Sequence, residues 1–309
     1  MKVVIIGGGI IGLTTALQLK HELRNAEITI FASDFNNTVS HVAAGIFRVG
    51  SSYFGPTEEI TRCWIRDSYE YYDDIRKSHE ASFAGITAIS GYLFANSSPE
   101  TVKNHWIEDL VPIYRKATDE EFELVEEISG IKLEERKLNS LTELVSDWDL
   151  IMNCTGLGAR SLCNDKRLVS IRGQILKVNA PWLKTFFYGE LDTYIIPGFN
   201  GIVTLGGSRN FDSENLKPCL YESTAIHNRC KNFLPNIKKA EVVKIEVGLR
   251  PHRENNVRVE REQIINGFSK AILVHNYGHG GYGVCTAPGT AKYAIKLAKE
   301  MHKSSISKL

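Results

Sequence analysis

The sequence predicts an α/β protein in which a parallel-sheet domain, discontinuous along the chain, is joined to a second, α+β domain built on an antiparallel sheet. Two apolar runs predict the first domain. Residues 3–6 lead through glycines into a helical pattern, and residues 271–276 lead through another glycine loop into a terminal helix at 286–302. From residue 168 onward, β-rich runs separated by glycine or proline predict the antiparallel sheet.

The other elements follow from hydrophobic periodicity. Helices are predicted at 13–24, 57–77, 101–110, 122–132 and 216–233. Strands are predicted at 27–32, 86–94, 133–138, 150–154, 168–178, 193–197, 202–205 and 241–247. These elements divide the chain into a first domain of residues 1–55, 123–167 and 251–309 and a second domain of residues 56–122 and 168–250.

Composition and charge narrow the classes of function. The chain has 309 residues, of which 43% are apolar and 24% charged, and its formal net charge is +1. No global field therefore favours nucleic acid or an anionic membrane, and recognition of an anion must be local. No apolar run approaches the ~20 residues of a membrane helix, and we expect no secretory signal before the first strand. The six cysteines lack metal-like spacing, which predicts reduced thiols and no metal site.

The first strand runs into a GxGxxG motif, which is the fingerprint of a dinucleotide site when a strand precedes it and a helix follows. Gly7 would allow a tight turn, Gly9 a close approach of the backbone to a pyrophosphate, and Gly12 close packing of the helix on the strand. The helix N-terminus, at Ile10 and Ile11, would offer free N–H groups to the phosphates. A glycine-rich turn without a ligand is the alternative interpretation.

Two short stretches after the second strand extend this site. Asp34, preceded by Ser33, stands where an acidic residue ~20 positions after the last glycine binds ribose hydroxyls. An ordinary turn residue is the alternative for Asp34. The small residues Ala43, Ala44 and Gly45 would permit close approach of a flat ligand or close helix packing.

Seven further motifs follow the fingerprint along the chain. They are VAAG at 42–45, RGQ at 172–174, APW at 180–182, YIIPG at 194–198, TLGG at 204–207, VGLRP at 247–251 and HNYGHGGYG at 275–283. Together with the glycine motif they resemble the D-amino-acid oxidase family of flavoproteins. The resemblance spans nearly the whole chain in the family's order, which makes it more specific than any single motif.

The resemblance implies a Rossmann-like FAD-binding domain, with FAD and not NAD in the nucleotide site. It implies oxidative deamination of a D-amino acid to a 2-oxo acid, ammonia and hydrogen peroxide, by hydride transfer to the flavin with oxygen as acceptor. Because the flavin is the electron sink, the protein supplies binding and orientation. The predicted cofactor-binding residues are Gly7, Gly9, Ile10, Ile11, Gly12, Ser33, Asp34, Ala43, Ala44, Gly45, Gly156, Gly280, Gly281, Tyr282, Gly283 and Cys285.

A carboxylate clamp must fix the substrate against the flavin, and Arg250 and Tyr194 match the family's residues for this role. A planar guanidinium can take a carboxylate through two parallel hydrogen bonds, and the tyrosine hydroxyl adds a donor. Arg250 directly follows the predicted strand 241–247 and precedes Pro251, so we expect it at a strand end. A surface salt bridge is the alternative for Arg250.

Two arginines favour the branch of the family that oxidises D-aspartate and D-glutamate, the D-aspartate oxidases. Arg209 follows the TLGG strand and Arg229 ends the next helix, and both match the arginines that this branch uses for the distal carboxylate. The branch needs such cations because a buried, unpaired carboxylate is costly. The alternatives are solvated surface charges, an oxidase of neutral D-amino acids, or a catalytically impaired FAD-binding variant.

The sequence departs from the family in several places. A family segment that usually follows a position like Phe122 is missing, which would leave an open sheet edge, an exposed pocket or a poorly folding chain. Ser33 stands where the family has an aspartate, His41 replaces an acidic residue, and Cys285 replaces a threonine at the flavin ring. We interpret His279 as structural, because the substrate amine can lose its proton to solvent.

The last three residues, Ser307-Lys308-Leu309, form the address for peroxisomal import. We therefore expect a location in the peroxisome matrix, where hydrogen peroxide is destroyed, and the peroxisomal import receptor as a partner. The other expected partners are an acidic D-amino acid and oxygen, without nucleic acid or membrane.

Overall fold

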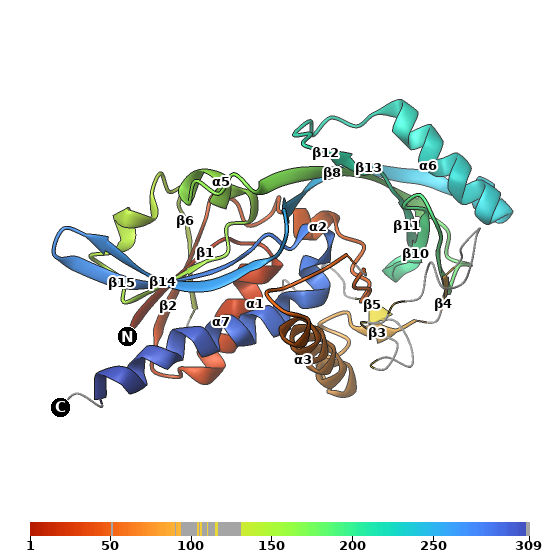
Figure 1. Cartoon of the computed structure of the whole chain (residues 1–309). Coiled ribbons are helices and arrows are strands. Elements are labelled where there is room, and N and C mark those ends of the chain that lie inside the picture. The colour runs from red at the N-terminus through yellow and green to blue at the C-terminus, as the bar shows by residue number, and fades with distance from the viewer. Residues whose placement is uncertain are drawn as a thin grey trace.

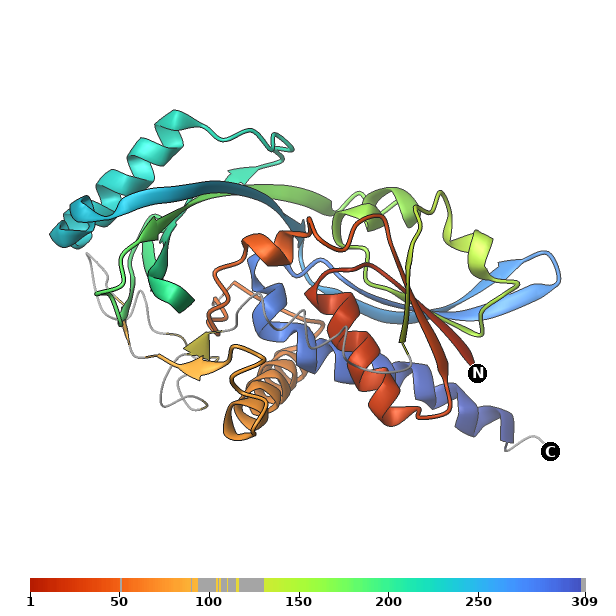
Figure 2. The ribbon, with the colours of Figure 1, turned by 180° about the vertical axis from the view of Figure 1, so that it is seen from behind.

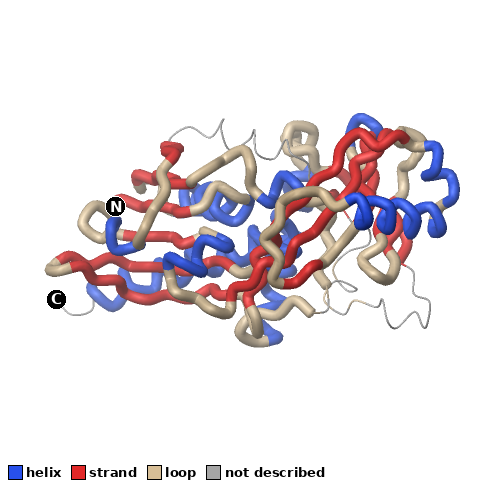
Figure 3. The backbone as a smooth tube through the Cα atoms, turned by 90° about the horizontal axis from the view of Figure 1, so that it is seen from above, coloured by secondary structure: helices blue, strands red, loops and turns tan. Residues whose placement is uncertain are grey.

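The computed structural model describes residues 1–50, 52–89, 91–93, 104, 106, 110, 115–116 and 131–306. These residues form an elongated molecule with a mainly parallel sheet towards one end and an antiparallel sheet towards the other (Figures 1 and 3). This agrees with the predicted fold class. Within these described ranges, no helix is both long and apolar enough to cross a membrane.

The N-terminal strand lies inside the first sheet. β1 (Lys2–Ile6) pairs in parallel with β2 (Glu27–Ala32) on one side and with β7 (Leu150–Asn153) on the other. The late strand β15 (Ser269–Tyr277) pairs in parallel with β7, and β6 (Ile131–Glu135) pairs in parallel with β2. Segments from both ends of the chain therefore build one sheet, as predicted.

Alternate residues of β1 face two different cores. Val3 and Ile5 belong to the larger core, whereas Val4 and Ile6 face a smaller cluster with the 3-10 helix Leu141–Leu144. Three helices supply or cover the larger core (Figure 2), and they are α1 (Ile10–Glu22), α3 (Glu58–Lys77) and α7 (Gly283–Ile306). Because both faces are buried from Val3 onward, the strand is apolar at every position after Lys2 rather than at alternate ones.

Two long strands dominate the second sheet. β8 (Leu168–Asn179) and β13 (Glu241–Arg253) pair antiparallel along their lengths and arch from the first sheet towards α6 (Leu220–Phe233) (Figure 1). Ile226 and Cys230 of α6 are buried against this sheet. The shorter strands of the sheet are β4 (Gly91–Leu93), β9 (Phe186–Tyr188), β10 (Tyr194–Pro197), β11 (Ile202–Gly206) and β12 (Asn210–Phe211).

Several smaller elements complete the described fold. They are α2 (Val39–Val42), α5 (Ala159–Leu162), the paired strands β3 (Thr87–Ala88) and β5 (Arg115–Lys116), and the edge strand β14 (Arg258–Asn266), antiparallel to β15. Strand β14 was not predicted from the sequence, because its cluster of charged residues, three of them consecutive at 260–262, is typical of an exposed loop.

The structure corrects three predicted elements. The predicted strand 86–94 contains two strands in different sheets, because β3 pairs with β5 whereas β4 pairs with β9. Residues 131 and 132 of the predicted helix 122–132 belong to β6, where they pair with β2. Asn104, Trp106 and Leu110 of the predicted helix 101–110 are not helical. The remaining residues of these two helices lie outside the described ranges.

The predicted domain boundaries also need two corrections. Helix α3 falls in the segment 56–122 that was predicted to join the second domain, but Trp64 packs in the larger core of the first sheet and Tyr72 Oη donates to Val284 O at 2.6 Å. Its apolar stripe therefore faces α7. Strand β13 continues to Arg253, past the predicted boundary at residue 250, because β8 supplies partners along its whole length.

Candidate active site

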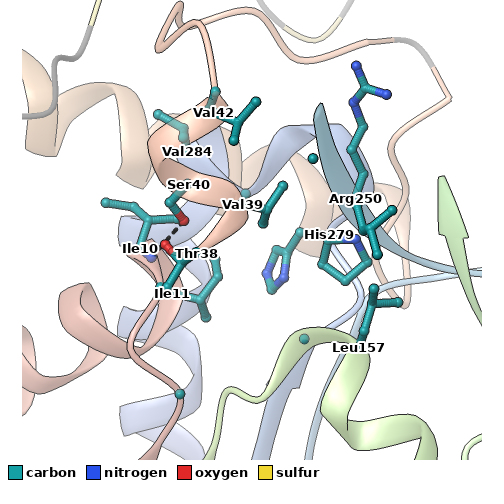
Figure 4. Close-up of a pocket in the computed structure, with 18 of the residues that line it drawn as sticks. Ile10, Ile11, Thr38, Val39, Ser40, Val42, Leu157, Arg250, His279 and Val284 are labelled. Atoms are coloured by element: carbon teal, nitrogen blue, oxygen red, sulfur yellow. Dashed lines mark hydrogen bonds between the residues drawn. The ribbon is translucent and has the colours of Figure 1, made fainter. Parts of the chain in front are cut away.

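A cavity of about 660 Å³ is lined by segments that are far apart in the sequence. It begins at the glycine turn after β1, passes α2 and the end of β7, and reaches β13 and the loop before α7. Figure 4 shows part of it, with Ile10 and Ile11 on one side and Arg250 on the other. All of the predicted site residues line the cavity except Gly12 and Arg229.

The first glycine turn has the backbone geometry that its sequence predicts. Gly7 has φ +121°, and a Cβ there would lie 2.3 Å from Cys154 O. A Cβ on Gly12 would lie 1.9 Å from Gly7 O, so this glycine lets α1 pack on the turn and does not face the cavity. Only glycine fits both positions, for two different reasons.

The N-terminus of α1 forms an open cradle at the cavity. Its N-cap residue, Gly9, has no capping side chain, and a Cβ there would meet only Ser40 Oγ at 3.3 Å and Thr38 Cβ at 3.9 Å. Ser40 Oγ accepts a hydrogen bond from the Ile10 N–H at 3.0 Å. The Ile10 N–H is therefore not free, contrary to the prediction, and a phosphate at this helix N-terminus would meet the other N–H groups of the first turn. These residues fit the pyrophosphate of a dinucleotide.

The predicted ribose-binding residue also stabilises its own loop. Asp34 Oδ1 accepts hydrogen bonds from the backbone N–H groups of Asn36 (2.7 Å) and Asn37 (3.0 Å), and Oδ2 accepts one from Asn37 Nδ2 (2.8 Å). These bonds hold the pKa of the Asp34 carboxyl below its usual range, the Asn37 side chain having the largest effect. Asp34 is thus a turn residue at the cavity, beside exposed Ser33, and its contact with ribose stays a prediction.

Sequence analysis missed two cationic residues at this end of the cavity. Arg136 and Lys137 directly follow β6 and line the cavity. The Arg136 guanidinium lies 5.0 Å from the centre of the Phe31 ring on the neighbouring strand. Their position just after a parallel strand could have identified both residues, because ligands bind beyond the carboxyl ends of parallel strands.

Arg250 lies at the opposite end of the cavity, inside β13 and three residues before the last residue of this strand, rather than at the strand end as predicted. Its backbone pairs with Ile171 of β8. The absence of a side chain at Gly173 makes room for the guanidinium, since a Cβ there would lie 2.1 Å from Arg250 Nη1. Nη1 donates to Ser208 O at 3.2 Å, and no carboxylate of the described residues pairs with this guanidinium. Arg250 is therefore an oriented cation in a wall of the cavity.

Tyr194 lies beside Arg250 and lines the same cavity. The ring is 9% exposed. Burial raises the pKa of Tyr194 to about 12, although the neighbouring Arg250 acts to lower it. The hydroxyl group is therefore protonated at neutral pH and can donate a hydrogen bond. A guanidinium and a hydroxyl donor at one end of the cavity form the arrangement that a carboxylate clamp requires.

The two arginines predicted to bind a distal carboxylate are in different positions. Arg209 lines the cavity, but its Nε and Nη2 atoms each donate to the carboxylate of Asp192 at 3.0 Å. Arg229 lies outside the cavity lining, where Nη2 donates to Gly207 O at 2.6 Å and Nε to Thr193 Oγ1 at 3.2 Å. Arg229 thus fixes the wall that carries Arg209, and the predicted direct contact with substrate is not supported.

The last glycine loop returns the chain to the cavity. Gly280 has φ +58°, and it precedes Gly281, Tyr282 and Gly283 along the lining. Cys285 Sγ donates to Ile46 O at 3.1 Å and accepts from the backbone N–H of Arg48 at 3.3 Å. Burial raises the pKa of Cys285 to about 11, so the thiol stays protonated and joins this loop to the segment after Gly45.

His279 is buried in the same loop, with Nε2 and Thr290 Oγ1 3.2 Å apart. Burial lowers its pKa to about 3, well below the ~6.5 of an exposed histidine. The ring is therefore neutral at physiological pH, in agreement with a structural role.

We expect acid to destabilise the protein partly through His279. The unfolded state binds a proton below pH ~6.5 whereas the folded state does not until about pH 3, so stability is lost as pH falls through this window. At pH 5 the loss from this one group is about 2 kcal/mol relative to pH 7.5. Urea unfolding at both pH values should show a loss smaller by this amount in His279→Gln, whereas the same substitution at exposed His21 should leave the loss unchanged. An unaltered pH dependence in His279→Gln would contradict the assignment.

The fold and the cavity together define a class of protein, the FAD-dependent oxidoreductases with a substrate domain on an antiparallel sheet. Within the described residues no group of histidine, cysteine, aspartate or glutamate side chains could hold a metal ion. The chain matches the DAO family, described as FAD dependent oxidoreductase, over residues 2–128 and 110–297, and it belongs to this family. FAD is its cofactor, and the prediction of FAD rather than NAD is confirmed.

Two relatives and one solved structure are similar to the chain over almost its whole length. The chain is 31% identical to D-aspartate oxidase from Homo sapiens over 327 residues, which cover 97% of this chain and 95% of the relative. It is 29% identical to D-amino acid oxidase from Dugesia ryukyuensis over 330 residues, which cover 97% and 98%. L-α-glycerophosphate oxidase from Mycoplasma pneumoniae, solved with FAD bound, shares the fold with a TM-score of 0.70 at 14% identity and coverage of 96% and 94%.

Both sequence alignments contain more positions than the 309 residues of this chain. The relatives therefore carry residues that this chain lacks, in agreement with the predicted missing segment. The predicted place of the deletion, after Phe122, lies outside the described residues.

Proposed function

We propose that this protein oxidises acidic D-amino acids, D-aspartate and D-glutamate, with FAD as cofactor and oxygen as electron acceptor. The observation that carries the proposal is the charge at the clamp end of the cavity. Three arginines, Arg48, Arg209 and Arg250, line that end, and the only acidic side chain of the described lining there is Asp192. The net charge of two positive units complements a substrate with two carboxylates.

The side chains of this chain would bind and orient the substrate. Bound FAD would supply the redox chemistry by accepting a hydride from the substrate Cα. Arg250 and Tyr194 would hold the α-carboxylate, which fixes the face that the Cα–H presents. Tyr194 keeps its proton at neutral pH, and burial lowers the pKa of His279 to about 3, which makes its neutral ring a weak base. The substrate amine would therefore lose its proton to solvent.

The first test of this function is the visible spectrum of the purified protein. We expect anaerobic D-aspartate to bleach the flavin absorbance, and we expect kcat/KM for D-aspartate to exceed that for D-alanine by at least about tenfold, because a charge-assisted hydrogen bond contributes about 1.5–3 kcal/mol. Oxygen consumption measures both rates. A preference for D-alanine would support a neutral D-amino-acid oxidase instead, and a yellow protein without turnover would support the impaired variant.

The peroxisomal location stays part of the proposal. Ser307-Lys308-Leu309 lies outside the described residues, so the support comes from the sequence and from the hydrogen peroxide that such a reaction produces.

A further inference from the structure

The three arginines at the clamp end of the cavity differ in what already neutralises them. Arg250 belongs to the α-carboxylate clamp. Arg209 has its charge satisfied within the protein, because both oxygens of Asp192 accept hydrogen bonds from its guanidinium. A substrate carboxylate could bind Arg209 only by displacing Asp192 or by approaching a neutral pair. Arg209 is therefore a poor site for a distal carboxylate.

Arg48 has no such partner. Its Nε atom is buried without a hydrogen-bond acceptor, and no carboxylate or carbonyl group of the described residues bonds to its guanidinium. The guanidinium lies over an aromatic ring instead, with Cζ 3.9 Å from the centre of the Tyr188 ring. A cation–π contact orients a guanidinium but leaves its donors free. A buried donor without an acceptor is costly, which points to an anionic ligand.

Arg48 is also held in place relative to the α-carboxylate clamp. The rings of Tyr188 and Tyr194 are stacked, with centroids 5.5 Å apart and an interplanar angle of 15°. Tyr188 pairs with Tyr194 across neighbouring strands, and Tyr194 lies beside Arg250. The backbone N–H of Arg48 is fixed on Cys285 Sγ. Arg48 and Arg250 are therefore two oriented cations connected by a stack of two tyrosines.

We propose that Arg48 is the residue that binds the distal carboxylate of the substrate, and that Asp192 removes Arg209 from this role. The assignment rests on the proposed acidic substrate and deepens it. Arg250 and Arg48 supply one charge for each of the two carboxylates, and the Arg209–Asp192 pair contributes none. Tyr188 acts as a positioning residue, because it orients the guanidinium without contacting the substrate.

The test compares Arg48→Gln with the double variant Arg209→Gln/Asp192→Asn in the FAD-loaded protein, because removal of Arg209 alone would leave the Asp192 carboxylate unpaired in the cavity. We expect Arg48→Gln to lower the ratio of kcat/KM for D-aspartate to that for D-alanine by about 100-fold, since it removes one partner of a charge pair. The double variant removes both charges of the pair and should lower this ratio by less than about fivefold. Arg48→Lys should restore part of the ratio, because it returns the charge without the planar group.

Equilibrium binding supplies a readout without turnover. D-Malate and D-lactate differ only in the distal carboxylate, and titration of the flavin spectrum gives a dissociation constant for each. We expect wild type to prefer D-malate and Arg48→Gln to lose this preference. Tyr188→Leu should weaken D-malate binding, and Tyr188→Phe, which keeps the ring, should restore it.

The outcomes separate this inference from the proposed function. If wild type prefers D-aspartate but the double variant Arg209→Gln/Asp192→Asn loses the preference and Arg48→Gln keeps it, Arg209 binds the distal carboxylate and the inference is wrong while the function stands. If Arg48→Gln loses FAD, Arg48 serves the cofactor and the inference is again wrong. If wild type shows no preference for D-aspartate or D-malate, the proposed function fails and the inference fails with it.

Discussion

Replacing Arg250 with glutamine is expected to lower kcat/KM for D-aspartate and for D-alanine alike, by about 10³-fold. Both substrates share the α-carboxylate that this guanidinium would hold, and loss of a buried, hydrogen-bonded charge pair costs about 2–5 kcal/mol. We expect a loss near the upper end of this range. Ser208 O already orients the Arg250 guanidinium, and Gly173 leaves room for it. Oxygen consumption over a range of substrate concentrations measures the loss.

The flavin content should separate this effect from a cofactor defect. Arg250 lies at the end of the cavity opposite the glycine turn of α1, so Arg250→Gln should keep its FAD. Arg160→Gln removes one positive charge from an exposed ion pair with Glu214 outside the cavity, and it should behave as wild type. A loss in Arg250→Gln that is confined to D-aspartate would show that Arg250 binds the distal carboxylate instead.

Replacing Gly9 with valine is expected to give a folded protein that is colourless. The position has extended backbone, with φ −86° and ψ 178°, which a β-branched residue adopts readily. A Cβ would have no protein contact shorter than 3.3 Å, so the fold should tolerate it. The valine methyl groups would fill the cradle where the pyrophosphate approaches the backbone, and we expect FAD affinity to fall by at least about 100-fold.

A second glycine in the same motif provides the comparison. Gly12→Ala would place its Cβ 1.9 Å from Gly7 O, so it should disrupt the packing of α1 on the turn and lower stability. Circular dichroism and urea unfolding of the apoproteins should therefore show a native fold for Gly9→Val and a destabilised one for Gly12→Ala. Titration with FAD, followed by flavin fluorescence, measures affinity. Wild-type FAD affinity in Gly9→Val would contradict the placement of the cofactor.

The nucleotide half of the site could be predicted because its signals are local. Gly7 and Gly12 are required by backbone geometry within the motif and its first contacts, and the spacing of the glycines encodes that geometry. The strands 2–6, 150–153 and 269–277 were predictable because each contains a continuous apolar run, at 3–6, 150–152 and 271–274, that is largely buried on both faces.

Elements whose structure depends on a distant partner were harder to predict. Strand β13 continues through Arg250 and Pro251, where charge and proline indicate an end, because β8 offers hydrogen-bond partners as far as Leu168. The amphipathic pattern of α3 predicted a buried face but not which domain would bury it, and the structure places α7 against it. Hydrophobic periodicity indicates that one face of a helix is buried, but it does not indicate which element packs against that face.

The sequence alone determined the family and the cofactor, and it supplied Arg250 as the residue proposed for the α-carboxylate clamp, because these depend on motifs that are continuous in the chain. Only the tertiary structure decided which further arginine is available to a substrate. Arg209, which follows the TLGG strand, was predicted because it matches an arginine that the D-aspartate oxidases use for the distal carboxylate, but Asp192, 17 residues away, binds its guanidinium. No sequence motif pointed to Arg48, yet folding places its guanidinium over the ring of Tyr188 in the cavity. The charge that a ligand meets depends on such long-range pairings, which local sequence does not encode.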